Sequence, residues 1–200
     1  MGRFFKEFRE RLDLFEDDFA GAVERRRVML RYRLERGRAF FEDATVKAQR
    51  QARKSTVASL GQTYLRNLVA APFIYGLIFP LAALDLFATV YQAVAFRLWD
   101  IPRVSRRDYV ILDRHRLAYL NWVRKLNCLY CGYANGVLAY VTQIARRTEQ
   151  YWCPIKHAVR IRNVDRRYLD FADYGDADNI EEEFRRQRAA LRKNDEASRR

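Results

Sequence analysis

Three cysteines and one histidine form two close pairs in this chain. Cys128 and Cys131 stand in C-x2-C spacing in "CLYC", and Cys153 and His157 stand in C-x3-H spacing in "CPIKH". Structural zinc sites take four ligands, usually as two close pairs from separate segments, and Cys3His is one of their ligand sets. The 132–152 stretch is long enough for one helix and a return turn. The spacing therefore predicts a zinc site on these four residues.

Other chemistry is open to the same side chains. Three cysteines and a histidine can also hold an iron–sulfur cluster, although no C-x-C spacing favours one. A Cys128/Cys131 pair is typical of thiol oxidoreductases, in which the first thiolate attacks a disulfide, and "CLYC" resembles the motif of membrane thiol oxidases that reduce quinone. Free cysteines can also be plain core residues. His115, in "DRHR", is expected to be structural, with replacement of His157 as the fourth ligand as the alternative.

Other catalytic motifs are absent from the sequence. It contains no G-x-S-x-G, GxxxxGK[ST], HExxH or GxGxxG pattern. A hydrolase or a nucleotide-binding protein therefore has no candidate residue here. Whether the chain is an enzyme at all stays open at this point.

The candidate ligands follow a long apolar run. Residues 67–96 carry no Lys or Arg and a single acid, Asp85. A spanning helix needs roughly 20 apolar residues, so this run predicts a membrane segment over 67–101. Pro80 would either kink a single tilted span or bend a re-entrant hairpin. Basic residues on both sides favour the hairpin, with both ends cytoplasmic.

Asp85 is costly if it faces lipid, so we expect it to face another helix or a wet cavity. An acid inside a membrane segment is by default a candidate functional group. The simpler interpretation places it near the headgroups, or in a hydrogen bond with a Tyr or Gln side chain.

The net charge of +13 at pH 7 limits the choice of partners. Nucleic acid is one class of partner for so basic a chain, but the arginines flank the apolar run on both sides. That arrangement favours a lipid bilayer with anionic headgroups, each cation contributing about 1 kcal/mol near the surface. Nucleic acid is the less favoured partner, and we also expect a protein partner. Residues 1–30 lack the apolar core of a secretory signal, which predicts a reducing, cytosolic environment.

Amphipathic helices are predicted on both sides of the membrane segment. A basic helical arm covers 1–66, with an apolar stripe near its start and a second helical stretch over 28–58. The stripe consists of Phe5, Phe8, Leu12, Phe15, Phe19 and Ala22. This stripe packs on protein in one interpretation and enters the lipid interface in the other.

The Cys/His domain is predicted to be helical over 102–169. Pro102 ends any helix from the membrane segment. Apolar positions then recur every seven residues, and residues 134–136 are expected to break the helix in two because glycine costs about 1 kcal/mol mid-helix. The repeat consists of Leu112, Tyr119, Leu126, Tyr133 and Tyr140. An acidic-to-basic tail, 170–200, has Asp178 or Asn179 as a helix cap and a frayed end.

The blocks "NCLYCGYANG" and "RTEQYWCPIKHA", with the preceding hydrophobic segment, resemble an uncharacterised family of bacterial membrane proteins over residues 79–158. The resemblance implies residence in the bacterial inner membrane and places the four candidate ligands in the family's signature block. It implies no activity.

Taken together, the sequence predicts an all-α, membrane-attached protein with amphipathic helices and a Cys3His-clipped helical unit. We expect a zinc-binding scaffold or accessory subunit, with the bulk of the chain cytoplasmic. The alternatives are a membrane-linked thiol oxidoreductase and an iron–sulfur electron carrier.

Overall fold

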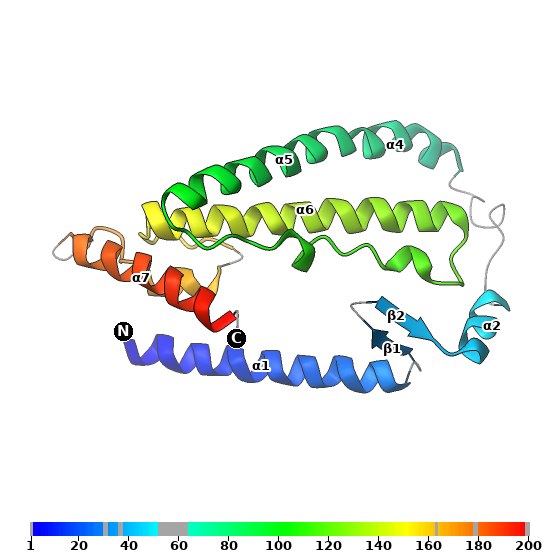
Figure 1. Cartoon of the computed structure of the whole chain (residues 1–200), viewed down its shortest axis with the longest axis horizontal. Coiled ribbons are helices and arrows are strands. Elements are labelled where there is room, and N and C mark those ends of the chain that lie inside the picture. The colour runs from blue at the N-terminus through cyan, green and yellow to red at the C-terminus, as the bar shows by residue number, and fades with distance from the viewer. Residues whose placement is uncertain are drawn as a thin grey trace. The chain divides into compact units, whose positions relative to one another are not determined.

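The computed structural model describes residues 2–29, 32–35, 38–51, 64–162, 164–177 and 180–198. The chain is mostly helical, which confirms the all-α prediction at the level of fold class (Figure 1). It divides into two compact units: the first unit comprises 1–78 with 111–134, and the second unit comprises 79–110 with 135–200. Each unit is therefore built from segments that are distant in sequence.

The N-terminal arm begins with helix α1, Gly2–Met29. Its length confirms a helix over the predicted stripe, and the side chains of Phe5, Phe8 and Leu12 lie outside the described residues. Phe15 and Phe19 are 68% and 64% exposed. No described residue of the first unit buries these two rings.

The predicted helix over 28–58 is wrong at 32–35 and 38–41 but is confirmed over 43–51. The chain instead forms an antiparallel hairpin of β1, Tyr32–Glu35, and β2, Arg38–Phe41, followed by helix α2, Asp43–Gln51. The register pairs Tyr32 with Phe41 and Glu35 with Arg38. Tyrosine and phenylalanine are residue types enriched in strands. The rest of the stretch, 52–58, lies outside the described residues.

The apolar run forms helix α4, Tyr64–Gly76, and helix α5, Ile78–Tyr91, which continues into a π-helical turn η1, Gln92–Phe96. One helix, Leu68–Phe96, has the length and apolar composition needed to cross a membrane. The preference for a hairpin bent at Pro80 was wrong, because this proline is the third residue of α5. Residues in the first turn of a helix need no intrahelical N–H donor, so proline is tolerated there.

Helix α6, Trp122–Trp152, is continuous, so the predicted break at residues 134–136 was wrong. Gly136 has a packing role instead. A Cβ at this position would lie 2.7 Å from the Tyr109 carbonyl oxygen and 2.8 Å from the Val110 Cα. The glycine therefore allows the chain at 109–110 to cross closely over the helix. Leu112 and Tyr119 of the predicted seven-residue repeat lie before α6 begins.

The core of the second unit lies where the end of η1, the following segment and α6 meet. It consists of Phe96, Ile101, Val104, Tyr140 and Ile144. The helix ends before Pro102, as predicted, through Asp100, which has a left-handed φ of 53°. The Ile101 N–H then donates to the Phe96 carbonyl at 2.8 Å, the bond of a Schellman C-cap.

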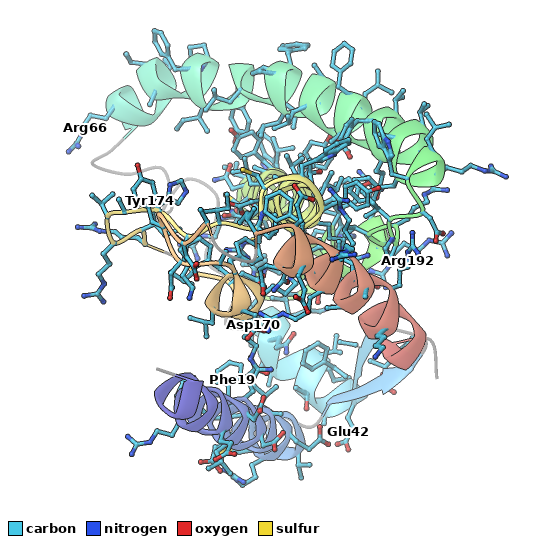
Figure 2. All side chains as sticks on the ribbon, turned by 90° about the vertical axis from the view of Figure 1, so that its left-hand side faces the viewer. Phe19, Glu42, Arg66, Asp170, Tyr174 and Arg192 are labelled. Carbon is cyan, nitrogen blue, oxygen red and sulfur yellow. The ribbon has the colours of Figure 1, made fainter. Side chains whose placement is uncertain are left out.

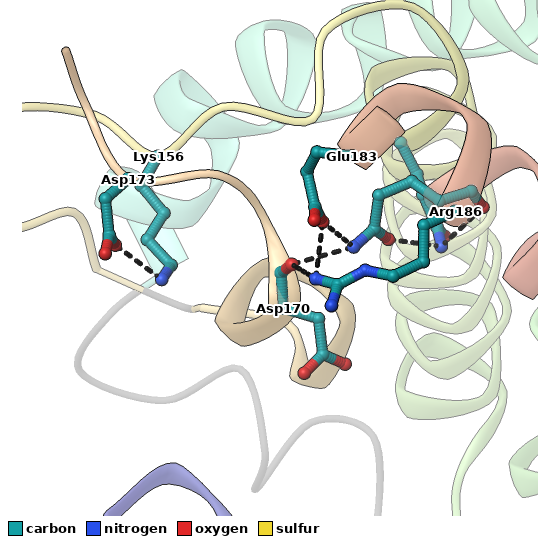
Figure 3. Close-up of polar contacts among 7 residues, drawn as sticks. Lys156, Asp170, Asp173, Glu183 and Arg186 are labelled. Atoms are coloured by element: carbon teal, nitrogen blue, oxygen red, sulfur yellow. Dashed lines mark hydrogen bonds and ion pairs between the residues drawn. The ribbon is translucent and has the colours of Figure 1, made fainter. Parts of the chain in front are cut away.

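The C-terminal part of the second unit packs through polar contacts. A short 3-10 helix, η4, Arg166–Asp170, precedes helix α7, Ile180–Ser198, so the predicted frayed end was wrong up to Ser198. The predicted caps Asp178 and Asn179 lie outside the described residues. The buried Gln187 donates to the Asp170 carbonyl at 2.7 Å, and Arg186 donates to the same carbonyl at 3.2 Å (Figure 3).

Candidate functional site

The C-x2-C pair lies within α6. Cys128 and Cys131 are three residues apart on this helix, so they occupy neighbouring positions on one of its faces. Cys128 is half-buried and Cys131 is exposed. Cys128 is the seventh residue of α6, so the pair lies beyond the first turn of the helix. Whether the pair acts as a redox dithiol stays a prediction.

The C-x3-H pair begins where α6 ends. Cys153 is exposed and its N–H continues the helical pattern by donating to the Glu149 carbonyl at 2.8 Å. It follows Cys131 by 22 residues along a continuous helix. A return turn between the pairs, which the zinc prediction needed, is absent because the helix occupies that stretch.

His157 packs against a tyrosine. The main-chain N–H of His157 donates to the Tyr168 hydroxyl at 2.6 Å. The rings of the two residues stack with centroids 6.3 Å apart. Nearby, Lys156 pairs with Asp173 at 2.7 Å (Figure 3). His115 belongs to a 3-10 turn, η3, Arg114–Arg116, in the first unit, and its Nδ1 is buried with no hydrogen-bond partner among the described residues.

Cys128 and Cys131 belong to the first unit, and Cys153 and His157 belong to the second unit. Across the described ranges, no group of three or more His, Cys, Asp or Glu side chains is placed to hold a metal ion. Zinc or an iron–sulfur cluster on Cys128, Cys131, Cys153 and His157 stays a prediction.

Asp85 is the first member of a polar site that the structure does assemble. It is 8% exposed and accepts from the Arg106 guanidinium in a forked arrangement, with Nη2 at 2.6 Å and Nε at 3.0 Å. Arg106 belongs to the 3-10 turn η2, Arg106–Asp108. A Tyr or Gln side chain was one of the surroundings predicted for Asp85, and the structure pairs it with a basic residue 21 positions later. A guanidinium that donates two hydrogen bonds in this bidentate way matches the geometry of a carboxylate best.

Gln92 is the second member. It is 2% exposed, and its amide bonds both main-chain groups of Val104, accepting from the N–H at 3.0 Å and donating to the carbonyl at 3.2 Å. It also donates to the hydroxyl of the fully buried Tyr140, which lies 3.3 Å from the Thr89 hydroxyl. The Gln92 side chain thereby bonds both the N–H and the carbonyl of Val104, as the main chain of a neighbouring β-strand would.

These contacts reveal two opposite faces on α5. Asp85, Gln92 and Phe96 face the interior of the second unit, whereas the other face exposes large apolar side chains. Figure 2 shows side chains, several of them aromatic rings, that project outward from the ribbon of the apolar helix. The exposed side chains include Phe79 at 76%, Leu86 at 62%, Phe87 at 71%, Val90 at 52% and Val94 at 56%. Polar groups thus point inward and apolar groups outward, the reverse of a helix on the surface of a water-soluble domain.

A shallow groove of about 810 Å³ lies between Tyr91 of α5 and the C-terminal half of α6. Its walls are mainly apolar or uncharged, with Arg146 and Glu149 as the charged members. The remaining lining residues are Leu138, Val141, Thr142, Ala145, Thr148, Trp152 and Cys153. Because the lining is mainly apolar, the groove is suited to contact with an apolar partner.

A second polar cluster, centred on Asp165, fastens the loop after α6. Asp165 accepts from the Arg167 guanidinium at 2.9 Å and pairs with Arg146 at 3.3 Å. Burial raises the pKa of Asp165, but the hydrogen bonds and positive charges of Arg167 and Arg146 outweigh it, so this pKa lies below its ordinary value. The Arg167 guanidinium also donates to the Gln143 side chain at 2.6 Å.

The sequence pattern indicated Asp85 as a candidate residue but indicated neither its partner nor the Gln92 contacts. A signal was present, because Asp85, Thr89, Gln92 and Phe96 recur at spacings of three and four, which places them on one helical face. The partner could not be assigned, because several arginines follow the apolar run and only the folded chain selects Arg106.

No protein-family model, no curated protein and no solved structure matches this chain.

Proposed function

We propose that this protein is a membrane-attached scaffold or accessory subunit that acts by binding rather than by catalysis. The inverted polarity of α5 carries the proposal. Its exposed face is apolar from Phe79 to Val94, and its polar side chains Asp85 and Gln92 are satisfied from within. A bilayer is the environment in which an apolar exterior is favourable and every interior polar group must have a partner.

The charge distribution supports the same proposal. Arg97, Arg103 and Arg107 are exposed on the segment that follows the apolar helix. Cations at this place attract anionic headgroups. We propose that the membrane is the bacterial inner membrane and that the bulk of the chain is cytoplasmic.

A protein partner is part of the proposal because a scaffold needs one. The groove beside Tyr91 offers a mainly apolar surface of a size suited to one side of a helix. Thr142 and Ala145, which line the groove, are small, and small residues permit close approach of helices in membranes.

Flotation with vesicles tests membrane attachment. The full chain should rise with vesicles of phosphatidylcholine and phosphatidylglycerol. The double substitution Phe79→Glu with Phe87→Glu should lower the partition coefficient at least 100-fold, because each charge placed in hydrocarbon costs about 2.5–3.5 kcal/mol.

A matched control adds the same charge elsewhere. Val159 and Tyr174 are 73% and 70% exposed and lie outside the apolar helix, so Val159→Glu with Tyr174→Glu alters electrostatic attraction equally. This variant should still float. Equal loss from both double variants, or a wild-type chain that stays at the bottom of the gradient, would contradict the proposal.

Metal content tests the predicted zinc site separately. The separation of the two pairs along α6 gives no reason to expect a stoichiometric ion on these residues. Elemental analysis that finds one zinc per chain, lost on Cys153→Ser, would show that the four residues do converge and would overturn this interpretation of α6.

A further inference from the structure

The helix Leu68–Phe96 is long enough to cross a membrane, yet a charged, non-helical segment packs beside it in the second unit. We propose that α5 and η1 lie in the plane of the membrane surface, with the apolar face immersed and the Asp85–Arg106 pair on the side facing water. This inference rests on the proposed membrane attachment and specifies its geometry.

The position of Asp85 along the helix carries the first step. It lies 17 residues after Leu68 and 11 before Phe96, close to the middle of the candidate span. At 1.5 Å per residue it would sit about 5 Å from the midpoint of a perpendicular helix. A spanning orientation therefore places the Asp85–Arg106 pair near the centre of the hydrocarbon layer.

The exposure of the partner segment carries the second step. The Arg106 side chain is 42% exposed, and its neighbours Arg107 and Asp108 are exposed as well. Residues 101–105, which lead to them, are not helical. Charged side chains and open backbone at mid-depth are not tolerated against lipid, so a spanning orientation is disfavoured at this level of the helix.

The angular arrangement on α5 carries the third step. With 3.6 residues per turn, Leu86, Val90 and Val94 centre on the side opposite to Asp85 and Gln92. A helix with its side chains is about 10–12 Å across. An in-plane helix buries its apolar face about 5–10 Å into the interface, which leaves the opposite face in the headgroups or water. In this orientation the apolar face of α5 contacts hydrocarbon, and the face that carries Asp85 contacts headgroups or water.

The end of the helix carries anchors suited to an interface. The rings of Trp99 and Trp152 make an edge-to-face contact at 5.1 Å, and their side chains are 37% and 46% exposed. Tryptophan is enriched at the headgroup level of membranes. Arg97 and Arg103 are exposed nearby along the chain and can meet anionic headgroups. The surface therefore fits an anionic bilayer as its occupant.

Spin-label depth measurements test the orientation. In a background with Cys128, Cys131 and Cys153 changed to Ser, single labels are placed by Phe79→Cys, Leu86→Cys, Val90→Cys and Val94→Cys. Collision rates with oxygen and with a nickel chelate then give each label's depth in phosphatidylcholine–phosphatidylglycerol vesicles. The in-plane helix predicts one shallow depth for all four labels.

A spanning helix predicts a different profile. Phe79 and Val94 are 15 residues apart, so their depths would differ along an axis of about 22 Å, with a maximum near the bilayer centre. A depth that varies in this way overturns the inference but leaves membrane attachment intact. A chain that fails to float with vesicles overturns the proposed function itself.

Proteolysis of the unmodified chain gives a second measurement without substitutions. Trypsin added outside sealed vesicles should remove both flanks of the apolar segment, at Arg66 and at Arg97, because both lie on one side of an in-plane helix. Fragments that keep one intact flank in every bound molecule would indicate a span and overturn the inference.

Discussion

The second unit contains α7 and, from Phe79 onward, α5 with its continuation η1; each of these two helical stretches buries a glutamine, but their outer faces differ. In α7, Gln187 and Leu191 face inward and Arg185 and Arg192 are exposed. In α5 and η1, Gln92 faces inward and the outer face is apolar. Side-chain polarity on the inner face thus does not distinguish the two helices.

The outer faces identify the surroundings for which each helix is suited. The charged exterior of α7 is favourable in water, whereas the apolar exterior of α5 is favourable in lipid. A single compact unit therefore has one side suited to each solvent. Three substitutions test this comparison between the two sides of the unit through their effects on the free energy of unfolding.

The largest expected effect comes from removing the guanidinium that pairs with the buried Asp85. Arg106→Ala should lower the free energy of unfolding by about 1.5–3 kcal/mol, because it removes the charge-assisted hydrogen bonds to the mostly buried Asp85 carboxylate, and the 42% exposure of the Arg106 side chain limits the effect. Denaturant titration in mild detergent, followed by tryptophan fluorescence, measures it.

Arg192→Ala on α7 is the matched control. Its partner Asp100 is 80% exposed at the side chain, and such surface pairs contribute about 0–1 kcal/mol. Equal destabilisation by the two substitutions would remove the distinction between the α5 side and the α7 side of the unit.

A smaller effect is expected where α6 meets the chain at 109–110. Gly136→Ala should destabilise the protein by about 1–3 kcal/mol, because the new methyl would contact backbone that cannot move aside easily. Gly76→Ala has nothing within 4 Å of its new Cβ and should be neutral or stabilising by up to about 1 kcal/mol. Thermal unfolding of both variants gives the comparison, and a stabilising Gly136→Ala would contradict the close crossing.

The smallest effect is expected in the polar cluster at Asp165. Asp165→Asn keeps the shape but removes the charge that Arg146 and Arg167 neutralise, and should cost about 1 kcal/mol at neutral pH.

This cost should depend on pH. Because the folded-state pKa of Asp165 lies below its ordinary value of 3.8, the stabilisation is complete above that pH and is lost as pH falls through the lower folded value. The difference between wild type and variant should thus stay constant from neutral pH to about 5 and close below about 4. A difference that grows on acidification would show that another group is responsible.

Much of the secondary structure was predictable. The apolar run, the helix over the Cys/His block, the stop before Pro102 and the acidic start of α7 each follow from local composition. The errors arose where a glycine or proline had two possible roles. Gly136 suggested a break and instead permits a close crossing, and Pro80 suggested a bend but lies in a first turn.

The candidate site was predicted less well, for a geometric reason. C-x2-C and C-x3-H spacings describe two local pairs, and they could meet only if the chain between them turned back. Residues 132–152 can form either a helix with a turn or one unbroken helix, and local sequence does not choose between these. Packing of the segment at 109–110 against Gly136 favours the unbroken helix.

By itself, the sequence determined that this chain is helical, basic and equipped with an apolar segment long enough for a membrane, because composition and periodicity are local properties. The tertiary structure decided which polar groups of that segment turn inward and which partners they take. Asp85 and Arg106 are 21 residues apart, and Gln92 and Tyr140 are 48 apart. Contacts over such distances depend on how the chain returns past its own helix, which no local pattern specifies.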